Sequence, residues 1–296
     1  MKLNVLLTGG SGFIGRNILE SYLIEKYNII APRRSELDLV DDDNVKRCFA
    51  ENKIDVVIHS AIKPGHRNAK DPTNLFYTAS RMFFNITRHS ASYRKLIVLG
   101  SGSVYDMMTQ DLCKVSEDFF DTKMPLDEHG FFRFISAKFI ELMDNSVDLR
   151  IFSIFGKYED YEIRFISNAI CKAIYDLPIT IKQNRRFDFL YIDDLMPILD
   201  HFIQNDVKYK AYNITPNSAI DLYEIALKAK AISGKDLPIV VGKPGMGFEY
   251  SGSNKRLRDE VPGLRFSNID ESISKLYRWY SENKHSINRD LLLFDK

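Results

Sequence analysis

Residues 2–15 decide the fold of this chain, and they read Lys2-Leu3-Asn4-Val5-Leu6-Leu7-Thr8-Gly9-Gly10-Ser11-Gly12-Phe13-Ile14-Gly15. An apolar run of strand length meets three glycines spaced three residues apart, and a helical pattern of apolar residues follows. In a strand, turn and helix of this kind, the glycines allow the turn, let a pyrophosphate approach the backbone and let the helix pack on the strand. The free N–H groups and positive end of the helix favour phosphate. The segment therefore predicts a dinucleotide site.

The bulk composition indicates a globular enzyme and excludes several other classes. The chain has 296 residues, of which 45% are hydrophobic, and a formal net charge of +1. This charge favours neither nucleic acid nor a membrane surface as a partner. The sequence shows no signal peptide and no run of membrane-spanning length, so we expect a cytoplasmic protein. Three scattered cysteines predict neither a disulfide framework nor a metal site, and they are Cys48, Cys113 and Cys171.

Strand and helix patterns alternate through the first half of the chain. Apolar, β-branched runs predict strands at residues 27–31, 54–58 and 96–99, and amphipathic patterns predict helices at residues 43–52 and 71–89. This alternation requires a parallel sheet with right-handed crossovers. Ligands of such sheets bind at the carboxyl ends of the strands.

The spelling Thr8-Gly9-Gly10-x-Gly12-Phe13-Ile14-Gly15 resembles the nucleotide-binding turn of the extended short-chain dehydrogenases/reductases, a family of nucleotide-sugar epimerases, dehydratases and reductases. Later motifs extend the resemblance over nearly the whole chain. It implies an α/β fold with a Rossmann-type doubly wound parallel sheet. A cofactor-binding domain is expected at residues 1–155 and a smaller lobe, mainly for the nucleotide sugar, at residues 156–296, with segments crossing between them.

The cofactor is expected to be NADP, with NAD as the alternative. An NAD site has an acidic residue after the second strand, where this chain has Arg33 and Arg34. Arginine instead suits a 2′-phosphate because its forked donors match phosphate oxygens. By resemblance, the cofactor-binding residues are Gly9, Gly12, Phe13, Ile14, Arg33, Asp38, Leu39, Ala61 and Lys138.

The segment from Ser101 to Tyr105 resembles the family's Ser-x-x-Val-Tyr element, whose serine hydrogen-bonds the reacting sugar oxygen. This role maps to Ser101, and Ser103 is a second possible donor. Family dehydratases carry an Asp-Glu pair where this chain has Gly102 and Ser103. Without these carboxylates, water elimination has no evident acid or base, so a 4,6-dehydratase is not expected.

The family's Tyr-x-x-x-Lys pair places a proton donor and a ribose-binding lysine one turn apart on a helix. Lys138 fits the lysine, but Phe134 then stands in place of the tyrosine. A second register aligns His129 and Arg133 and loses both residues, so Phe134 and Lys138 are preferred. The chain could be an engineered, nearly inactive variant, a natural enzyme with another acid such as His129 or Tyr105, or a binding protein without activity.

The second half of the chain carries the expected substrate residues. Residues 185–195 match a segment that the family uses at the nucleotide-sugar site, in which Arg186 would reach the diphosphate. The resemblance implies reduction of a 4-keto nucleotide-diphosphate sugar, as in the branch that includes GDP-fucose synthase. A UDP-sugar 4-epimerase using NAD and a non-catalytic binder are the alternatives. The expected substrate-binding residues are Ser103, Tyr105, Asn168, Arg186 and Lys243.

Relatives in this family commonly pair two long helices from each subunit, so we also expect a homodimer. The pairing helices would be residues 71–89 and the one containing residues 131–143, which is rich in phenylalanine. Such an aromatic helix suits a buried seam between subunits.

Overall fold

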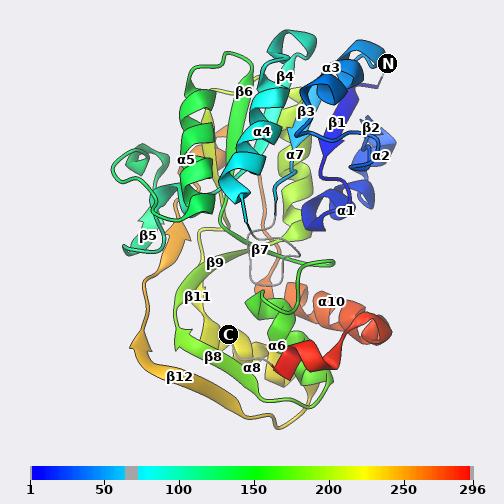
Figure 1. Cartoon of the computed structure of the whole chain (residues 1–296). Helices are drawn as coiled ribbons and strands as arrows, with labels where there is room; N and C mark the ends of the chain where they lie inside the picture. Colours follow the sequence, from blue (N-terminus) through cyan, green and yellow to red (C-terminus); the bar gives the residue numbers. More distant parts are fainter. Residues whose placement is uncertain (1, 64–72, 294–296) are drawn as a thin grey trace.

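The computed structural model describes residues 2–63 and 73–293. Its centre is a six-stranded sheet in which every neighbouring pair of strands is parallel (Figure 1). The strands lie in the order β10 (Ala211–Ile214), β6 (Ser146–Ile151), β4 (Lys95–Ser101), β3 (Val56–His59), β1 (Asn4–Thr8) and β2 (Asn28–Ile30). The prediction of a parallel α/β sheet is confirmed.

Successive side chains of a strand point to opposite faces of the sheet, and in these strands both sets are apolar. Helices therefore cover both faces. Leu6 and Val57 pack on one face under three helices, whereas Val5 and Leu7 pack on the other. The first set of helices is α3 (Asp42–Glu51), α4 (Leu75–Thr87) and α5 (Glu128–Glu141), and the second set is α1 (Phe13–Leu19) and α7 (Leu195–Gln204). The sheet is therefore doubly wound, as expected.

A smaller lobe lies beyond the carboxyl ends of the central strands (Figure 1). It contains a second sheet, a two-stranded ribbon and three helices that pack on one another. The sheet is built from β11 (Ala219–Asp221), β9 (Arg186–Tyr191), β13 (Tyr250–Gly252) and β5 (Leu112–Val115), with β7 (Ser153–Phe155) beside β9. The ribbon is β8 (Ile179–Asn184) with β12 (Ile239–Met246), and the helices are α6 (Phe165–Ile174), α8 (Leu222–Ser233) and α10 (Ile269–Glu282).

The chain passes between the two lobes more than once. Strand β5 precedes residue 155 yet belongs to the second sheet, whereas β10 and α7 follow it and belong to the first lobe. A single boundary near residue 155 is therefore only approximate. Lys243, expected at the substrate, lies in β12 and pairs with Gln183 of β8. The helix expected at residues 71–89 is observed as α4, and residues 71 and 72 lie outside the described part.

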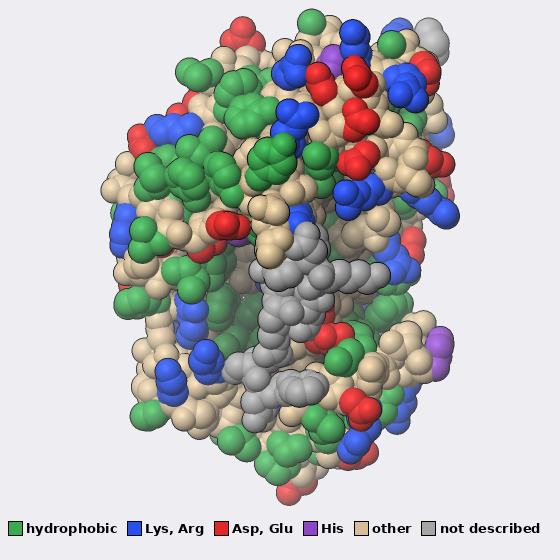
Figure 2. All heavy atoms as spheres, in the orientation of Figure 1, with side chains coloured by type: hydrophobic (Ala, Val, Ile, Leu, Met, Phe, Trp, Pro, Cys, Tyr) green, Lys and Arg blue, Asp and Glu red, His purple; other side chains and the backbone are tan. Residues whose placement is uncertain are grey.

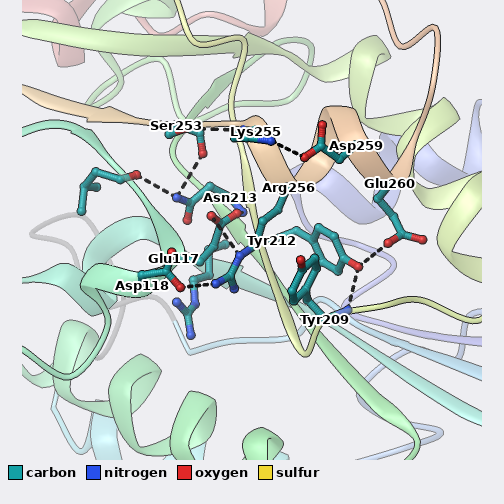
Figure 3. Close-up of polar contacts among 12 residues, drawn as sticks. Glu117, Asp118, Tyr209, Tyr212, Asn213, Ser253, Lys255, Arg256, Asp259 and Glu260 are labelled. Atoms are coloured by element: carbon teal, nitrogen blue, oxygen red, sulfur yellow. Dashed lines mark hydrogen bonds and ion pairs between the residues drawn. The ribbon is translucent and has the colours of Figure 1, made fainter.

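Charged and hydroxyl side chains tie the C-terminal segment to the edge strand β10 (Figure 3). Arg256, in α9 (Lys255–Glu260), pairs with Asp118 and lies 3.7 Å from Glu117. Glu117 in turn accepts the backbone N–H of Asn213 at 2.7 Å. The Tyr212 hydroxyl donates to Glu260, at 2.6 Å. These bonds fix residues 117–118 and α9 against the same strand, so the second lobe is anchored directly to the central sheet.

No helix in residues 2–63 or 73–293 is both long enough and apolar enough to cross a membrane.

Candidate functional site

The glycine turn lies where the strand order of the central sheet reverses, between β1 and β3. Gly9 has a φ of +74°, which L-residues with a side chain rarely adopt. A Cβ on Gly9 would lie 2.8 Å from the backbone nitrogen of Ala61, so the loops after β1 and β3 are in close contact. Helix α1 begins after Gly12 without a side-chain cap. Switch points of this kind are where doubly wound sheets bind ligands.

A histidine joins these two loops under the turn. The Thr8 Oγ1 lies 2.9 Å from His59 Nδ1, and Ala61 donates its backbone N–H to the same oxygen at 3.3 Å. His59 is buried, and burial together with the positive charge of Arg133 lowers its pKa to about 3. His59 is therefore neutral at physiological pH. It acts here as a packed link between β1 and β3.

The residues expected at the adenosine end of the cofactor follow β2. Arg33 is exposed, and its backbone N–H donates to Glu36 at 2.7 Å. Arg34 lies 3.6 Å from Asp38, whose carboxylate also accepts the backbone N–H of Val40. Leu39 is buried in the core under α3 and α4. The exposed guanidinium of Arg33 is thus at the carboxyl end of a sheet strand, where the sequence placed it.

The two predicted serines lie at the end of β4 and the start of the 3₁₀ turn η2 (Gly102–Tyr105). Ser101 accepts the backbone N–H of Ser103 at 3.1 Å. The Ser103 Oγ lies 3.3 Å from His129 Nδ1, and the hydroxyls of Ser101 and Tyr250 share a hydrogen bond. The serines therefore touch a histidine from α5 and a tyrosine from the second lobe.

Helix α5 presents one face to this turn. Asp127 caps the helix by accepting the backbone N–H of Gly130 at 2.9 Å. A Cβ on Gly130 would lie 3.1 Å from the carbonyl oxygen of Ser103, and Ala137 packs with the residues after it. Positions 130 and 137 share this face, and Arg133 and Phe134 flank it on either side, so the contacts of each residue decide which one lies toward the serines.

Arg133, one turn after His129 in α5, is a buried cation. The residue is 8% exposed, and its Nε has no hydrogen-bond partner within the described residues. Burial lowers its pKa to about 10, so the guanidinium keeps its charge at neutral pH. Burial and the charges of Arg133 and Arg164 lower the pKa of His129 to about 3. The site thus combines a neutral imidazole with a buried guanidinium whose Nε is unpaired, one turn apart.

The structure does not bring Phe134 and Lys138 to the two serines. Phe134 is buried against Phe120, with ring centroids 5.2 Å apart. The Lys138 Nζ pairs with Asp121 at 2.5 Å, and its side chain is 39% exposed. Their contacts are with Phe120 and Asp121, whereas His129 of the second register contacts Ser103. Because Phe134 and Lys138 lie on the flank of α5 that faces residues 120 and 121, the second register is the one that reaches Ser103.

The expected substrate residues do not all converge either. The Tyr105 hydroxyl is fully engaged in the core, donating to Asn213 at 2.7 Å and accepting from Arg150 at 2.9 Å. Asn168 is buried and donates to the carbonyl of Tyr161. Arg186 donates to the carbonyl of Ala219, toward β11, and Lys243 is exposed on β12. Of the five residues proposed to bind the substrate, Ser103 is the one whose contacts place it beside Ser101 and His129.

Three residues near the cluster were missed from the sequence. Tyr250 is buried and reaches Ser101, and Arg164 at the start of α6 affects the pKa of both Tyr250 and His129. Arg185 places its guanidinium 4.9 Å from the ring centroid of Phe187, which packs with Tyr250. A second arginine directly before Arg186 was a usable signal for Arg185. No local signal pointed to Tyr250.

Comparison with known proteins assigns the family. A sequence model described as the NAD dependent epimerase/dehydratase family matches residues 5–215, which is well over half of the chain. The chain belongs to this family. This confirms the resemblance drawn from the glycine turn and the later motifs.

Individual members of the epimerase/dehydratase family resemble the chain over nearly its full length. GDP-L-colitose synthase of Yersinia pseudotuberculosis is 25% identical, over 96% of this chain and 100% of that protein. A UDP-glucose 4-epimerase from Thermotoga maritima, solved with UDP-glucose, has a TM-score of 0.82 at 15% identity and covers 95% of this chain and 100% of its own. A GDP-mannoheptose C4 reductase from Campylobacter jejuni, solved with NADP, has a TM-score of 0.79 at 20% identity, with coverages of 94% and 98%. At these identities the structural likeness establishes the fold.

Proposed function

We propose that the chain binds NADP(H) and a nucleotide-diphosphate sugar, and that it reduces the 4-keto group of that sugar. One observation carries the proposal. A glycine turn, two serine hydroxyls and a buried guanidinium converge at the carboxyl ends of β1, β3 and β4. This is the end of a parallel sheet where nucleotide cofactors bind. Serine donors beside such a site suit a substrate oxygen that becomes negative during reduction.

The residues present fit a dinucleotide phosphate. Gly9 lies too close to Ala61, and Gly15 too close to Gly9, for either glycine to carry a side chain. Such close backbone approach leaves the turn open to a pyrophosphate. The guanidinium of Arg133, whose Nε is unpaired within residues 2–63 and 73–293, would offer donors to a hydroxyl of the cofactor ribose. Arg33 at the end of β2 would pair with a 2′-phosphate, which favours NADP over NAD.

The bound reduced nicotinamide would supply a hydride to the carbonyl carbon of the sugar. The side chains of this chain then have two tasks. Ser101 would hold the carbonyl oxygen by a hydrogen bond, which strengthens as negative charge develops on it, and Ser103 would hold His129. Burial raises the pKa of Tyr250, so its hydroxyl stays protonated and keeps Ser101 in place. A proton must also reach the oxygen, and its source is taken up in the next subsection.

A GDP-sugar is the first substrate class to test. The full-length relative named above is a GDP-L-colitose synthase, and one structural neighbour is a GDP-mannoheptose C4 reductase. Arg164 and Arg185 lie on the second-lobe side of the serine cluster, and two guanidinium groups there suit a diphosphate. Other neighbours are solved with NADP or with NAD, which supports the choice of cofactor class.

The test is reduction of 4-keto GDP-, UDP-, dTDP- and CDP-sugars by the purified chain with deuterium-labelled NADPH. We expect NADPH consumption and a product that carries one deuterium on the former carbonyl carbon. Replacing both serines by alanine should lower kcat by about 10²-fold, as for loss of oxyanion donors. Retained NAD with interconversion of a UDP-sugar would instead support the epimerase alternative. Binding of NADPH and GDP-sugars without turnover of any keto sugar would support the binding-protein alternative.

We also propose a homodimer formed through α4 and α5. Hydrophobic side chains gather over these two helices on the face shown in Figure 2. Tyr77 is 63% exposed and Leu142 is 83% exposed, beside the packed rings of Phe84 and Phe139. Exposed apolar patches of this kind mark association surfaces. Leu142→Lys should shift the chain toward monomer in sedimentation at micromolar concentration, whereas the control Met246→Lys on β12 should not. A monomeric parent would refute the dimer.

A further inference from the structure

We propose that His129 and Arg133 together replace the family's Tyr-x-x-x-Lys pair in this chain. His129 would give the proton to the carbonyl oxygen, and Arg133 would hold the ribose of the cofactor. The inference rests on the proposed function, since it assigns the acid and the cation of that reaction. It also removes the reason to regard the chain as inactive, because Phe134 is not at the reacting centre.

The placement of the two side chains is the first support. His129 and Arg133 are four residues apart in α5, so they lie one above the other on one face. Gly130, on the same face, packs against the carbonyl of Ser103, and the Ser103 hydroxyl lies 3.3 Å from His129 Nδ1. Lys138 instead pairs with Asp121 outside the site. The helix therefore directs His129 to Ser103 and places the charge of Arg133 beside it, whereas residues 134 and 138 contact residues 120 and 121.

His129 is built to act as a neutral donor. It lies in the first turn of α5, whose positive end disfavours an imidazolium, and Arg133 and Arg164 oppose a positive charge from two further directions. If the Ser103 hydroxyl donates to Nδ1, the single proton of the neutral ring is on Nε2. A neutral imidazole in such a setting can polarise a carbonyl oxygen, as in triosephosphate isomerase. His129 is only partly buried.

Arg133 is a charged group in need of a partner. It is buried among the ends of the central strands, and its Nε has no hydrogen-bond partner in the described chain. A buried donor left unsatisfied is costly, so a ligand that accepts from it would bind favourably. The negative charge of Asp148 stabilises the positive charge of Arg133 electrostatically. Arginine presents a fixed fork of donors, which suits two neighbouring ribose hydroxyls.

The proton balance of the step is simple. As the carbonyl carbon accepts a hydride, the π electrons of the C=O bond become a lone pair on oxygen. That oxygen takes the Nε2 proton of His129, which leaves an imidazolate beside the positive charges of Arg133 and Arg164, and a solvent proton then restores the neutral ring. One hydride and one proton are consumed for each alcohol formed, and no further oxidant or reductant is needed.

Two tyrosines are rival donors, and the geometry disfavours both. Tyr105 turns its hydroxyl into the core, where Asn213 and Arg150 engage it. Tyr250 bonds to Ser101 but is buried between Phe152 and Phe187. Tyr250 would therefore act by holding Ser101, so Tyr250→Phe serves as the rival variant in the test.

The first half of the test needs no turnover. NADPH binding is measured by fluorescence for the parent, Arg133→Met, Arg133→Lys and the matched variant Lys138→Met, each checked for an unchanged melting temperature. Arg133→Met should weaken NADPH by about tenfold or more, the effect of losing one charged hydrogen-bond donor, with partial recovery in Arg133→Lys. Lys138→Met should bind as the parent does. NMR of ¹⁵N-histidine should show His129 neutral at pH 7, with its proton on Nε2.

The second half uses whichever 4-keto sugar the parent reduces. His129→Phe keeps a ring but no donor, so kcat should fall by about 10²-fold or more while KM changes by about threefold or less. The double variant with His129→Tyr and Arg133→Lys restores the family pair on the same face and should recover much of the lost turnover. Phe134→Tyr should bring no gain, because its hydroxyl would face Phe120.

The outcomes separate the inference from the function that it serves. If the parent reduces no keto sugar, the proposed function is contradicted. The NADPH affinities and the histidine tautomer then still test the roles assigned to Arg133 and His129. The inference is overturned if His129→Phe keeps parental kcat, if Tyr250→Phe alone abolishes turnover, or if Lys138→Met loses NADPH while Arg133→Met does not. A charged His129 at pH 7 would overturn it as well.

Discussion

The buried His59 makes part of the chain's stability dependent on pH. Burial and the charge of Arg133 lower its pKa from 6.5 to about 3. In the unfolded chain the ring titrates near its ordinary value. Between pH 7 and pH 5 the unfolded form therefore takes up a proton that the folded form does not, and the folded form loses stability as the pH falls.

The magnitude follows from the interval over which only the unfolded state is protonated. At pH 5 the solution is about 1.5 pH units below the unfolded pKa, which corresponds to about 2 kcal/mol of lost stability. His59→Asn removes this titration and keeps a polar atom within reach of Thr8. The variant should be less stable than the parent at pH 7, because it loses the ring that packs near Phe83. The stability gap should shrink by about 2 kcal/mol at pH 5.

The assay is urea unfolding of parent and variant at both pH values, without cofactor. Buried carboxylates such as Asp148, whose pKa is raised by burial, titrate alike in both proteins and cancel in the difference. His285→Asn, at an exposed histidine, is the matched control, and its gap should be the same at both pH values. A gap for His59→Asn that is equal at pH 7 and pH 5, or wider at pH 5, would refute the reasoning.

Three further predictions concern the two binding sites. Arg33→Ala should weaken NADP binding by about tenfold and NAD binding much less, because a guanidinium pairs with the 2′-phosphate that NAD lacks. Equal losses of affinity for the two cofactors in calorimetry would contradict this. Gly15→Ala should lower the melting temperature, since its Cβ would lie 2.2 Å from the carbonyl oxygen of Gly9. Gly12→Ala, whose nearest contact would be 3.3 Å, should weaken NADPH with a smaller change in melting temperature, and the reverse order would count against this view of the turn. Arg185→Ala should weaken GDP-sugar binding by about tenfold and Arg186→Ala much less, because Arg185 lies over the Phe187 ring whereas Arg186 bonds to Ala219. Titration calorimetry of both variants decides between them.

Much of the fold could be predicted because its signals are local. The glycine turn after β1 shows itself in eight residues, since a tight turn and a close backbone approach each need glycine at a set position. Alternating strand and helix periods indicated a parallel sheet, and topology then put the binding site at its carboxyl ends. Ser101 and Ser103 were located for the same reason, because they directly follow a buried strand.

Local sequence signals did not determine which residues of α5 lie toward the two serines. Spacing of four residues puts any two positions on one face of a helix, so residues 129 and 133 satisfy it as well as residues 134 and 138. Gly130 and Ala137 allow the helix to lie close to the turn after β4, and the contacts of the flanking residues distinguish the pairs, since His129 meets Ser103 and Lys138 meets Asp121. The family motif favoured Lys138 because it has a lysine at that position. In the structure the buried cation is Arg133.

The sequence by itself therefore determined the sheet, the cofactor turn and the pair of serines, since each depends on residues that are neighbours in the chain. Only the tertiary structure decided which partners meet those serines. Tyr250 reaches Ser101 from a strand of the second lobe, and His129 reaches Ser103 from a helix that packs beside it. Contacts between residues distant in sequence arise from the packing of whole elements, and no local pattern of residues encodes them.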